Sequence, residues 1–240
     1  MEHNNKHNEV KFQNPHLTVD VVVFSIVNEQ LCTLMIKRQR APFQGNWALP
    51  RAEINPKLDA SLEFTAKRNI KLLLDVDTPY LEQVQTIGNN ERDPRGWSVS
   101  VVYYSLIAEN AFPVKENAQP LKWMTINETL SKALSFDHQH IIENCYHRLQ
   151  NKSLYTSLPI FLLPEEFTLT ELQKTYELVL GIKMEKKSFR RRLLDAGFLQ
   201  ETGRMRHANH RPALLYRLSE RQPYYFARII EGVRDSKNID

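Results

Sequence analysis

The amino-acid sequence predicts an α+β protein with two domains. Its 240 residues are enough for about two domains of ordinary size. Strand-like and helix-like patterns are mixed over residues 15–150, whereas residues 151–240 contain two helical patterns followed by a hairpin pattern. Residues 151–240 carry 16 Lys and Arg against 11 Asp and Glu, while residues 1–150 carry 16 against 17. We therefore expect a mixed domain over 15–150 and a smaller, basic domain over 151–240, after a disordered tail at 1–14.

Strand and helix patterns follow one another through the first domain. Residues 18–36 contain two runs rich in β-branched and apolar residues, separated by a short polar turn, which predicts a hairpin. Apolar residues at spacings of three and four predict a helix over 59–73. Two further strands are expected at 80–88 and 97–108 with a polar loop between them, and a helix is expected to start at Asp137 as its N-cap.

The second domain begins with a strong helix-start signal. Residues 168–171 form a capping box, and the helix that follows closes at Gly181. A short turn leads to a second helix at about 185–196, and a hairpin is expected over 198–218. A final helix is expected from Pro223, a favourable residue for a first turn. Two helices joined by a short turn and followed by a hairpin predict a winged helix-turn-helix.

The second of these helices is strongly basic. Residues 183–211 hold nine Lys and Arg against three Asp and Glu, and Phe189, Leu193 and Leu194 are spaced to face the domain core. The basic side chains would then face a polyanion, with the helix in the major groove of double-stranded DNA and the hairpin as a wing. The alternative is a helical domain with a solvated basic face. The candidate DNA contacts are Lys186, Lys187, Ser188, Arg190 and Arg191 on the helix, and Arg204, Arg206 and Arg211 in the hairpin.

Composition narrows the class of protein further. No apolar run approaches the roughly 20 residues that a membrane helix needs, so we expect no membrane span. The first residues are polar and show no apolar core of a secretory signal, which predicts a cytoplasmic protein. Cys32 and Cys145 lie too far apart to form a metal or redox motif, and we expect both to be reduced thiols.

A loop in the first domain carries two arginines and a tryptophan within residues 92–97. Guanidinium groups bind phosphate and an indole ring can stack on a flat ligand, so this loop is a candidate site for an anionic ligand. Asp93 could instead pair with either arginine, Trp97 could begin a core strand, Trp47 could pack in the core, and Arg38 could be a surface charge. The candidate ligand-binding residues are Arg38, Trp47, Arg51, Arg92, Arg95 and Trp97.

Several segments resemble one known family in the same order along the chain. They cover about residues 17–220, and the resemblance is to the Nudix-related regulators of NAD metabolism, repressors that join a Nudix-like domain to a winged helix. The matching segments are WALP at 47–50, SLEFTAKR at 61–68, ERDPRGWSVSVVYYSL at 91–106, LLPEEFTLTELQKTYELVLG at 162–181, KKSFRRRLL at 186–194 and HRPALLYRL at 210–218.

This resemblance implies both a fold and a function. The first domain is expected to be a Nudix-like α/β/α sandwich that senses ADP-ribose or a related NAD-derived nucleotide. The second is expected to bind operator DNA as part of a homodimer and to repress genes of NAD synthesis, salvage or pyridine uptake. A twofold dimer would require a palindromic operator. The segment at about 137–158, which joins the domains, is the expected transmitter between ligand and DNA.

The chain departs from active Nudix hydrolases at the metal-binding helix. Alignment on Leu62 and Arg68 leaves only Arg68 of the expected charged group, and Arg51-Ala52 stands where a glycine pair is expected. Magnesium requires oxygen ligands, usually carboxylates, so we expect no metal site, no cofactor and no hydrolase activity. We expect Leu72 and Leu73 to fill the inner face of the helix. The residues at the carboxylate positions of the hydrolase pattern are Ala60, Asn69, Leu72 and Leu73.

Three other functions remain open from the sequence. The protein could be an ADP-ribose hydrolase with an unusual metal site, or a regulator of the same architecture that responds to a sugar. It could also be a regulator whose sensor domain no longer binds a ligand, because Arg51 could either fill the pocket or add a contact to phosphate.

Overall fold

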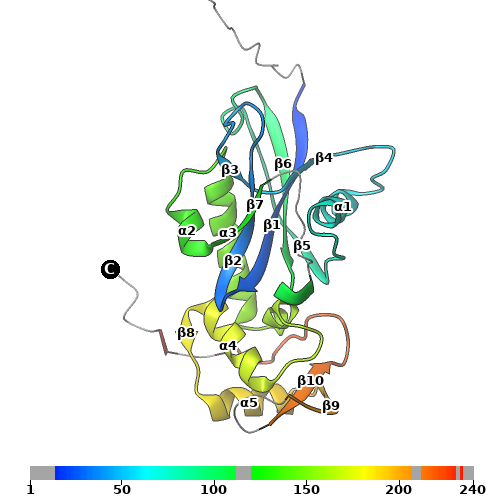
Figure 1. Cartoon of the computed structure of the whole chain (residues 1–240), viewed down its shortest axis with the longest axis vertical. Helices are drawn as coiled ribbons and strands as arrows, with labels where there is room; N and C mark the ends of the chain where they lie inside the picture. The colour runs from blue at the N-terminus through cyan, green and yellow to red at the C-terminus, as the bar shows by residue number, and fades with distance from the viewer. Residues whose placement is uncertain (1–13, 112–119, 207–211, 231–232, 235–240) are drawn as a thin grey trace, which may run out of the picture.

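Figure 1 shows the fold as a computed structural model, which describes residues 14–111, 120–206, 212–230 and 233–234. Of the tail expected at 1–14, all but residue 14 lies outside the described residues. In the part of the chain that the structure describes, no helix is long and apolar enough to cross a membrane.

The first domain is built on a mixed sheet of seven strands. The central order is β3-β2-β1-β6-β5, with β4 paired to β1 and β7 paired to β2. Only the β1–β6 pair is parallel among the registers described. The predicted hairpin at 18–36 and the strands predicted at 80–88 and 97–108 are present. The strands are β1 (His16–Val27), β2 (Gln30–Lys37), β3 (Trp47–Ala48), β4 (Arg51–Glu53), β5 (Tyr80–Asn89), β6 (Ser98–Leu106) and β7 (Leu121–Thr125).

Helices cover both faces of this sheet (Figure 1). α1 (Leu62–Leu74) packs on one face, and α2 (Ile126–Leu130) and α3 (His138–Ser153) pack on the other. β1 reads as an almost continuous apolar run because it is central and buried on both sides. Its alternate side chains enter different cores, with Val21 in the core under α1 and Val22 in the core under α3. The predicted α/β/α sandwich is therefore confirmed.

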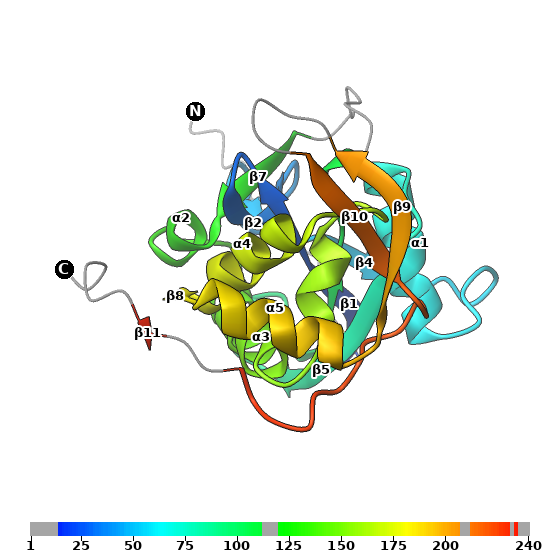
Figure 2. The ribbon, with the colours of Figure 1, turned by 90° about the horizontal axis from the view of Figure 1, so that it is seen from below.

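The second domain is a winged helix. Thr168 and Glu171 cap α4 reciprocally, as the capping box predicts, and Gly181 ends this helix at φ +66°, a backbone conformation that favours glycine. α5 and the β9–β10 hairpin follow, and Figure 2 shows them side by side at one end of the molecule. The elements are the 3₁₀ helices η1 (Glu109–Ala111, in the first domain) and η2 (Leu158–Leu162), α4 (Leu169–Leu180), β8 (Ile182–Lys183), α5 (Lys186–Asp195), β9 (Leu199–Arg206), β10 (Ala213–Leu218) and β11 (Val233–Arg234).

The helix expected from Pro223 is wrong, because the described residues 219–230 contain no helix. Backbone N–H groups of this segment donate hydrogen bonds to residues 154–157 rather than to carbonyl groups of their own segment. Phe226 N donates to Tyr155 O at 2.8 Å, and Tyr224 N donates to the Ser157 hydroxyl at 2.8 Å. The segment therefore lies along residues 154–157 in an extended conformation.

The two domains share helix α3. The expected boundary between residues 150 and 151 falls inside this helix, which runs to Ser153. Leu149 of α3 and Val179 of α4 belong to one buried cluster with the core of the first domain, and Gln150 Nε2 donates to Val179 O at 3.2 Å. Because these side chains are closely packed across the joint, a displacement of α3 would shift α4 as well.

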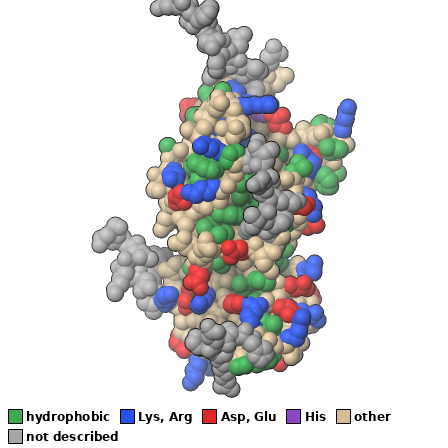
Figure 3. Space-filling model, in the orientation of Figure 1, with side chains coloured by type: hydrophobic (Ala, Val, Ile, Leu, Met, Phe, Trp, Pro, Cys, Tyr) green, Lys and Arg blue, Asp and Glu red, His purple; other side chains and the backbone are tan. Residues whose placement is uncertain are grey.

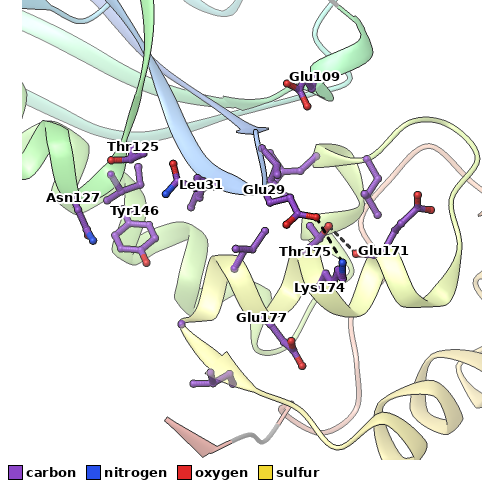
Figure 4. A pocket seen from close by; sticks show the side chains of 18 of the residues that line it. Glu29, Leu31, Glu109, Thr125, Asn127, Tyr146, Glu171, Lys174, Thr175 and Glu177 are labelled. Atoms are coloured by element: carbon purple, nitrogen blue, oxygen red, sulfur yellow. Dashed lines mark hydrogen bonds and ion pairs between the residues drawn. The ribbon is translucent and has the colours of Figure 1, made fainter. Parts of the chain in front are cut away.

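A cavity of about 1090 Å³ lies at this joint, between the β1–β2 turn and α4 (Figure 4). Lys174 of α4 lies 3.7 Å from the Glu29 carboxylate across it. Both side chains are largely exposed, so this ion pair contributes little to the stability of the joint compared with the buried cluster.

Candidate functional site

A buried carboxylate lies at the centre of the first domain. Asp20 of β1 stands opposite Arg51 of β4 and is fully buried. Arg51 donates from Nε and Nη2 to the two oxygens of Asp20 at 2.8 and 3.1 Å, and Ser100 Oγ donates at 2.6 Å. Burial alone would raise the pKa of Asp20, but the Arg51 charge and these hydrogen bonds hold the pKa well below its usual range.

Arg92 extends this network to the start of α3. Its side chain is buried, and Nη2 lies 3.4 Å from Asp20 Oδ2. Nε and Nη2 also donate to the two oxygens of Asp137, each at 2.9 Å. Asp137 occupies the predicted N-cap position, but its side chain makes no capping hydrogen bond. This carboxylate instead ties the loop after β5 to the first turn of α3.

His138, the first residue of α3, is buried in the same network. Leu49 N donates to its Nδ1 at 2.8 Å, so in the neutral ring Nε2 carries the proton. Nε2 lies 3.7 Å from Asp20 Oδ1. Burial lowers the pKa of His138 to about 4, although Asp20 acts in the opposite direction. His138 is therefore neutral near pH 7.

This burial predicts a dependence of stability on pH. Because the pKa of His138 is lowered in the folded chain, the unfolded chain takes up a proton first as the pH falls from 6.5 towards about 4. The contribution of His138 to the free energy of unfolding is therefore fully present well above pH 6.5. Between pH 7 and pH 5, protonation of His138 in the unfolded chain lowers the free energy of unfolding by about 2 kcal/mol. Urea unfolding at the two pH values measures the loss. In His138→Asn, the amide oxygen can still accept from Leu49 N, but no group titrates at this position, so the pH-dependent loss of unfolding free energy should be smaller. An equal loss in both proteins would contradict this assignment.

Arginine side chains line a cavity of about 680 Å³ beside this network. Burial lowers the pKa of Arg38, and the neighbouring charges of Arg51 and Arg95 lower it further. The carboxylates of Asp93 and Asp20 act in the opposite direction, so the positive charge of the cavity is partly compensated, and the part that remains would attract an anion. Five cations and one carboxylate are among the lining side chains: Lys37, Arg38, Arg40, Arg51, Arg95 and Glu53.

Two of these arginines lie on one aromatic ring. The guanidinium carbons of Arg38 and Arg51 are 4.7 and 4.3 Å from the ring centroid of Phe136, within the range of cation–π contacts. Phe43 packs edge-on against the same ring, with 5.0 Å between the centroids. Arg38 Nε also donates to Pro42 O at 2.7 Å. These contacts fix both guanidinium groups at the cavity wall.

Of the six predicted ligand residues, Arg38, Arg51 and Arg95 line this cavity, whereas Trp47, Arg92 and Trp97 do not. Arg92 is buried among carboxylates, as described above. Trp47 packs against the core under α3, as the alternative interpretation held. Trp97 is 46% exposed and its ring lies against Gly88, where an added Cβ would come within 3.0 Å of the indole.

The Arg95 side chain lines the cavity and also forms an ion pair within its own loop. It donates from Nε and Nη2 to the two oxygens of Asp93 at 3.0 and 2.8 Å. The local ion pair that the sequence left open is therefore present. Asp93 itself is buried, and its carboxylate lies 3.8 Å from Arg51 Nη1. This carboxylate orients two cavity arginines at once.

The helix that would hold metal in a hydrolase is α1. Asn69 is buried, whereas Leu72 is 71% exposed, so the expectation that Leu72 fills the inner face is wrong. Leu72 lies on the solvent side of the helix, while Leu73 is partly buried against the core under α1. Arg68 forms two hydrogen bonds to the Asp59 carboxylate, at 2.6 and 2.7 Å. In the described part of the chain, no three His, Cys, Asp or Glu side chains are grouped so that they could hold a metal ion.

These residues do not fit a magnesium ion. Leucine offers no ligand oxygen at two of the expected positions, and alanine offers none at a third. Asn69 supplies one neutral oxygen, and the Asp59 carboxylate is already bound by Arg68. Magnesium is usually held by carboxylates in proteins, and none of the expected positions supplies one; Glu63, the carboxylate on α1, lies elsewhere and is paired with Lys67.

α5 presents a cationic surface. Glu185 caps the helix by accepting from Lys187 N and Ser188 N at 2.9 and 2.6 Å, and Phe189 and Leu193 are buried in the domain core. Leu194, expected in the core, is 45% exposed. Figure 1 shows α5 at the end of the molecule away from the sheet. The exposed candidate DNA contacts are Lys186, Lys187, Ser188 and Arg191.

The other candidate cations on this surface have partners within the protein. Arg190 is half-buried and donates from Nη2 to Thr170 Oγ1 at 2.8 Å. Arg204 pairs with Glu166, and Arg206 pairs with Glu171. Acidic side chains are accordingly interspersed with basic ones on the face of the winged helix that Figure 3 shows. Arg211 lies outside the described residues.

The sequence did not identify four residues that shape the cavity and its network: Asp20, Phe43, Phe136 and His138. A charged residue inside the apolar run of β1 is the one signal that could have indicated Asp20, because an aspartate in a buried strand requires a partner. Nothing local marks the others, since their contacts are made across long sequence separations.

Comparisons with known proteins agree with this geometry. The chain is 41% identical over 225 residues to a protein of Acinetobacter baylyi described as an ADPR responsive transcriptional repressor, NtrR; the match covers 93% of this chain and 90% of the relative. The family model of the NrtR DNA-binding winged helix domain matches residues 159–218. The chain belongs to the NrtR family.

Two solved structures of Shewanella oneidensis NrtR extend the match. The one complexed with a 27mer DNA is 42% identical, has a TM-score of 0.84 and covers 90% of this chain and 99% of its own. The Nudix domain of that protein, complexed with ADP ribose, is 40% identical, has a TM-score of 0.53 and covers 57% of this chain and 90% of its own. The predicted resemblance to NrtR-like regulators is confirmed, and the family's winged-helix region spans α4, α5 and the β9–β10 hairpin.

Proposed function

We propose that this chain is a transcriptional repressor whose affinity for operator DNA responds to ADP-ribose or a closely related NAD-derived nucleotide. The observation that carries the proposal is the pairing, in one chain, of an arginine-lined cavity with an exposed cationic helix, joined through α3. The relatives support it: the A. baylyi protein is described as ADPR responsive, and the S. oneidensis protein was solved with DNA and, as its Nudix domain, with ADP ribose.

The cavity suits an anion that carries phosphate. Arg38, Arg51 and Arg95 line it, and guanidinium groups attract phosphate, although Arg51 and Arg95 already donate two hydrogen bonds each to Asp20 and Asp93. A neutral sugar carries no charge for the cavity cations to attract, so the cavity favours a nucleotide over a pentose. The regulated genes would then be those of NAD synthesis or salvage, whose product pool supplies the nucleotide.

We infer that the Nudix-like domain binds its ligand without cleaving it. The support is the donor set on and just before α1, where the carboxylate positions of the hydrolase pattern are held by Ala60, Asn69, Leu72 and Leu73. Without a cation, the charge that develops on a cleaved pyrophosphate would have nothing to stabilise it at this helix. Incubation with ADP-ribose and magnesium should therefore release no AMP above the rate without protein, and appreciable turnover would overturn this inference.

The DNA-binding unit is proposed to be a cytoplasmic homodimer on a palindromic operator. A winged helix reads one half-site, so two copies related by a twofold axis read two half-sites spaced by about one helical turn or a multiple of it. We assign base and phosphate contacts to Lys186, Lys187, Ser188 and Arg191. Arg204 and Arg206 could reach DNA only if they exchange their carboxylate partners for phosphates.

The test is DNA binding by the full chain. Fluorescence anisotropy should show binding at low salt to promoter DNA of NAD-synthesis or salvage genes that neighbour the gene for this protein, with an affinity that falls steeply as salt rises. Unrelated DNA of the same length provides the comparison. Equal affinity for both DNAs, or no binding at low salt, would overturn the proposal.

A further inference from the structure

Phe136 lies between the arginine cavity and helix α3. Its ring contacts Arg38 and Arg51 on the cavity side, and the ring of His138 lies 5.3 Å from it between centroids. Phe136 comes directly before Asp137, the N-cap of α3. The same side chain therefore touches the cations of the cavity and the first turn of the helix that leads to the second domain.

The backbone at this point is held in a strained conformation. Phe136 has φ +56°, in the left-handed region that residues with a side chain rarely adopt. Its neighbours are fixed on both sides: Ser135 N donates to Trp47 O at 2.9 Å, and Asp137 binds Arg92. A conformation of this kind persists when the surrounding packing determines it, and the packing here includes the two cavity arginines.

α3 carries any displacement onward. The helix is continuous from His138 to Ser153, and its last turns pack with α4 in the buried cluster of the joint. Beyond its end, Thr156 O accepts from Tyr176 of α4 at 2.7 Å, and the Tyr176 ring packs on Phe189 of α5, with 5.2 Å between centroids. A continuous series of packed groups thus runs from the cavity to the basic helix.

We propose that Phe136 is the residue that couples ligand binding in the arginine cavity to the position of α3. This inference rests on the proposed function. A ligand phosphate that binds Arg38 or Arg51 pulls that guanidinium towards itself, and the Phe136 ring that lies on the guanidinium must follow it or lose part of the contact. The ligand thereby changes the preferred placement of Phe136 and α3, and only such a differential contact lets a ligand shift a conformational equilibrium.

The experiment compares operator affinity with and without saturating ADP-ribose in three proteins. Coupling in wild type should change the operator Kd by about 5- to 150-fold. In Phe136→Leu, which removes the ring, we expect ADP-ribose to change the operator Kd by less than about twofold relative to that variant's own Kd without ADP-ribose. Phe64→Leu, which alters an exposed phenylalanine on α1, is the matched control and should respond as wild type does.

The outcomes separate this proposal from the proposed function. If wild type binds the operator but does not respond to ADP-ribose, the effector assignment fails and the coupling fails with it. If wild type responds and Phe136→Leu responds equally, only the role of Phe136 is overturned. Phe136→Tyr keeps the ring and should restore the response. Should Phe136→Leu not fold, as judged by circular dichroism, Phe136→Met replaces it: a reduced response in Phe136→Met would support the coupling, and a full response would overturn it.

Discussion

Replacing Asp20 with asparagine should lower the free energy of unfolding by about 3 kcal/mol or more, because removal of one charge leaves buried partners uncompensated. Arg51 and Arg92 both point at this carboxylate, and the side chains of Asp20 and Arg92 are 0% and 1% exposed. Asparagine has nearly the same shape, so the loss reports the charge and its hydrogen bonds rather than a cavity. Urea unfolding followed by circular dichroism measures it.

Asp77→Asn is the matched control for this prediction. Asp77 also pairs with a cation, Lys71, at 3.3 Å, but its side chain is 94% exposed. Exposed ion pairs contribute about 0 to 1 kcal/mol, so this variant should unfold almost as wild type does. Equal losses in Asp20→Asn and Asp77→Asn would show that the buried network does not stabilise the domain.

Arg191→Ala should weaken operator binding by about tenfold or more and reduce the dependence of binding on salt by about one released counterion. Arg191 is exposed on α5, so its removal should leave the free energy of unfolding unchanged within about 0.5 kcal/mol. Combining it with Lys187→Ala should lower operator affinity further, because the two exposed cations are expected to contact phosphates independently. Anisotropy titrations at several salt concentrations measure both quantities.

Arg190→Ala, one position away, provides the contrast. Its guanidinium is half-buried against Thr170 of α4, so its loss should lower the stability of the winged helix by about 1 kcal/mol. Its effect on the salt dependence should be smaller than that of Arg191→Ala. If Arg190→Ala changes the salt dependence and Arg191→Ala does not, Arg190 rather than Arg191 contacts the DNA, and our assignment is wrong.

Local patterns predicted most of the fold. The capping box at Thr168 and Glu171 fixed the start of α4, and Gly181 its end, because these signals act within a few residues. Mixed strands and helices predicted an α+β domain, the resemblance to the family implied the sandwich, and the turn and hairpin after α4 predicted the winged helix. The helix expected from Pro223 failed because residues 154–157 offer its backbone amides other partners, which no local pattern shows.

The site was predictable only in part. Arg38, Arg51 and Arg95 could be recognised as phosphate-binding residue types, and they line one cavity. Arg92 carries the same side chain but is buried on Asp137, 45 positions away, and that pairing depends on the folded chain. Leu72 was expected inside because it aligns with a carboxylate position of the hydrolase helix, yet the turn of α1 places it towards solvent. Phe136 and His138 acquire their roles only from tertiary contacts.

The most direct test of a sensor that binds without cleaving follows two signals in one sample. Protein and fluorescent operator are mixed with magnesium and ADP-ribose, and operator anisotropy and AMP release are recorded together. The structure predicts that the operator affinity changes promptly and stays changed while no AMP accumulates. AMP release that keeps pace with a reversal of the anisotropy signal, or an operator affinity that ADP-ribose leaves unaltered, would contradict it.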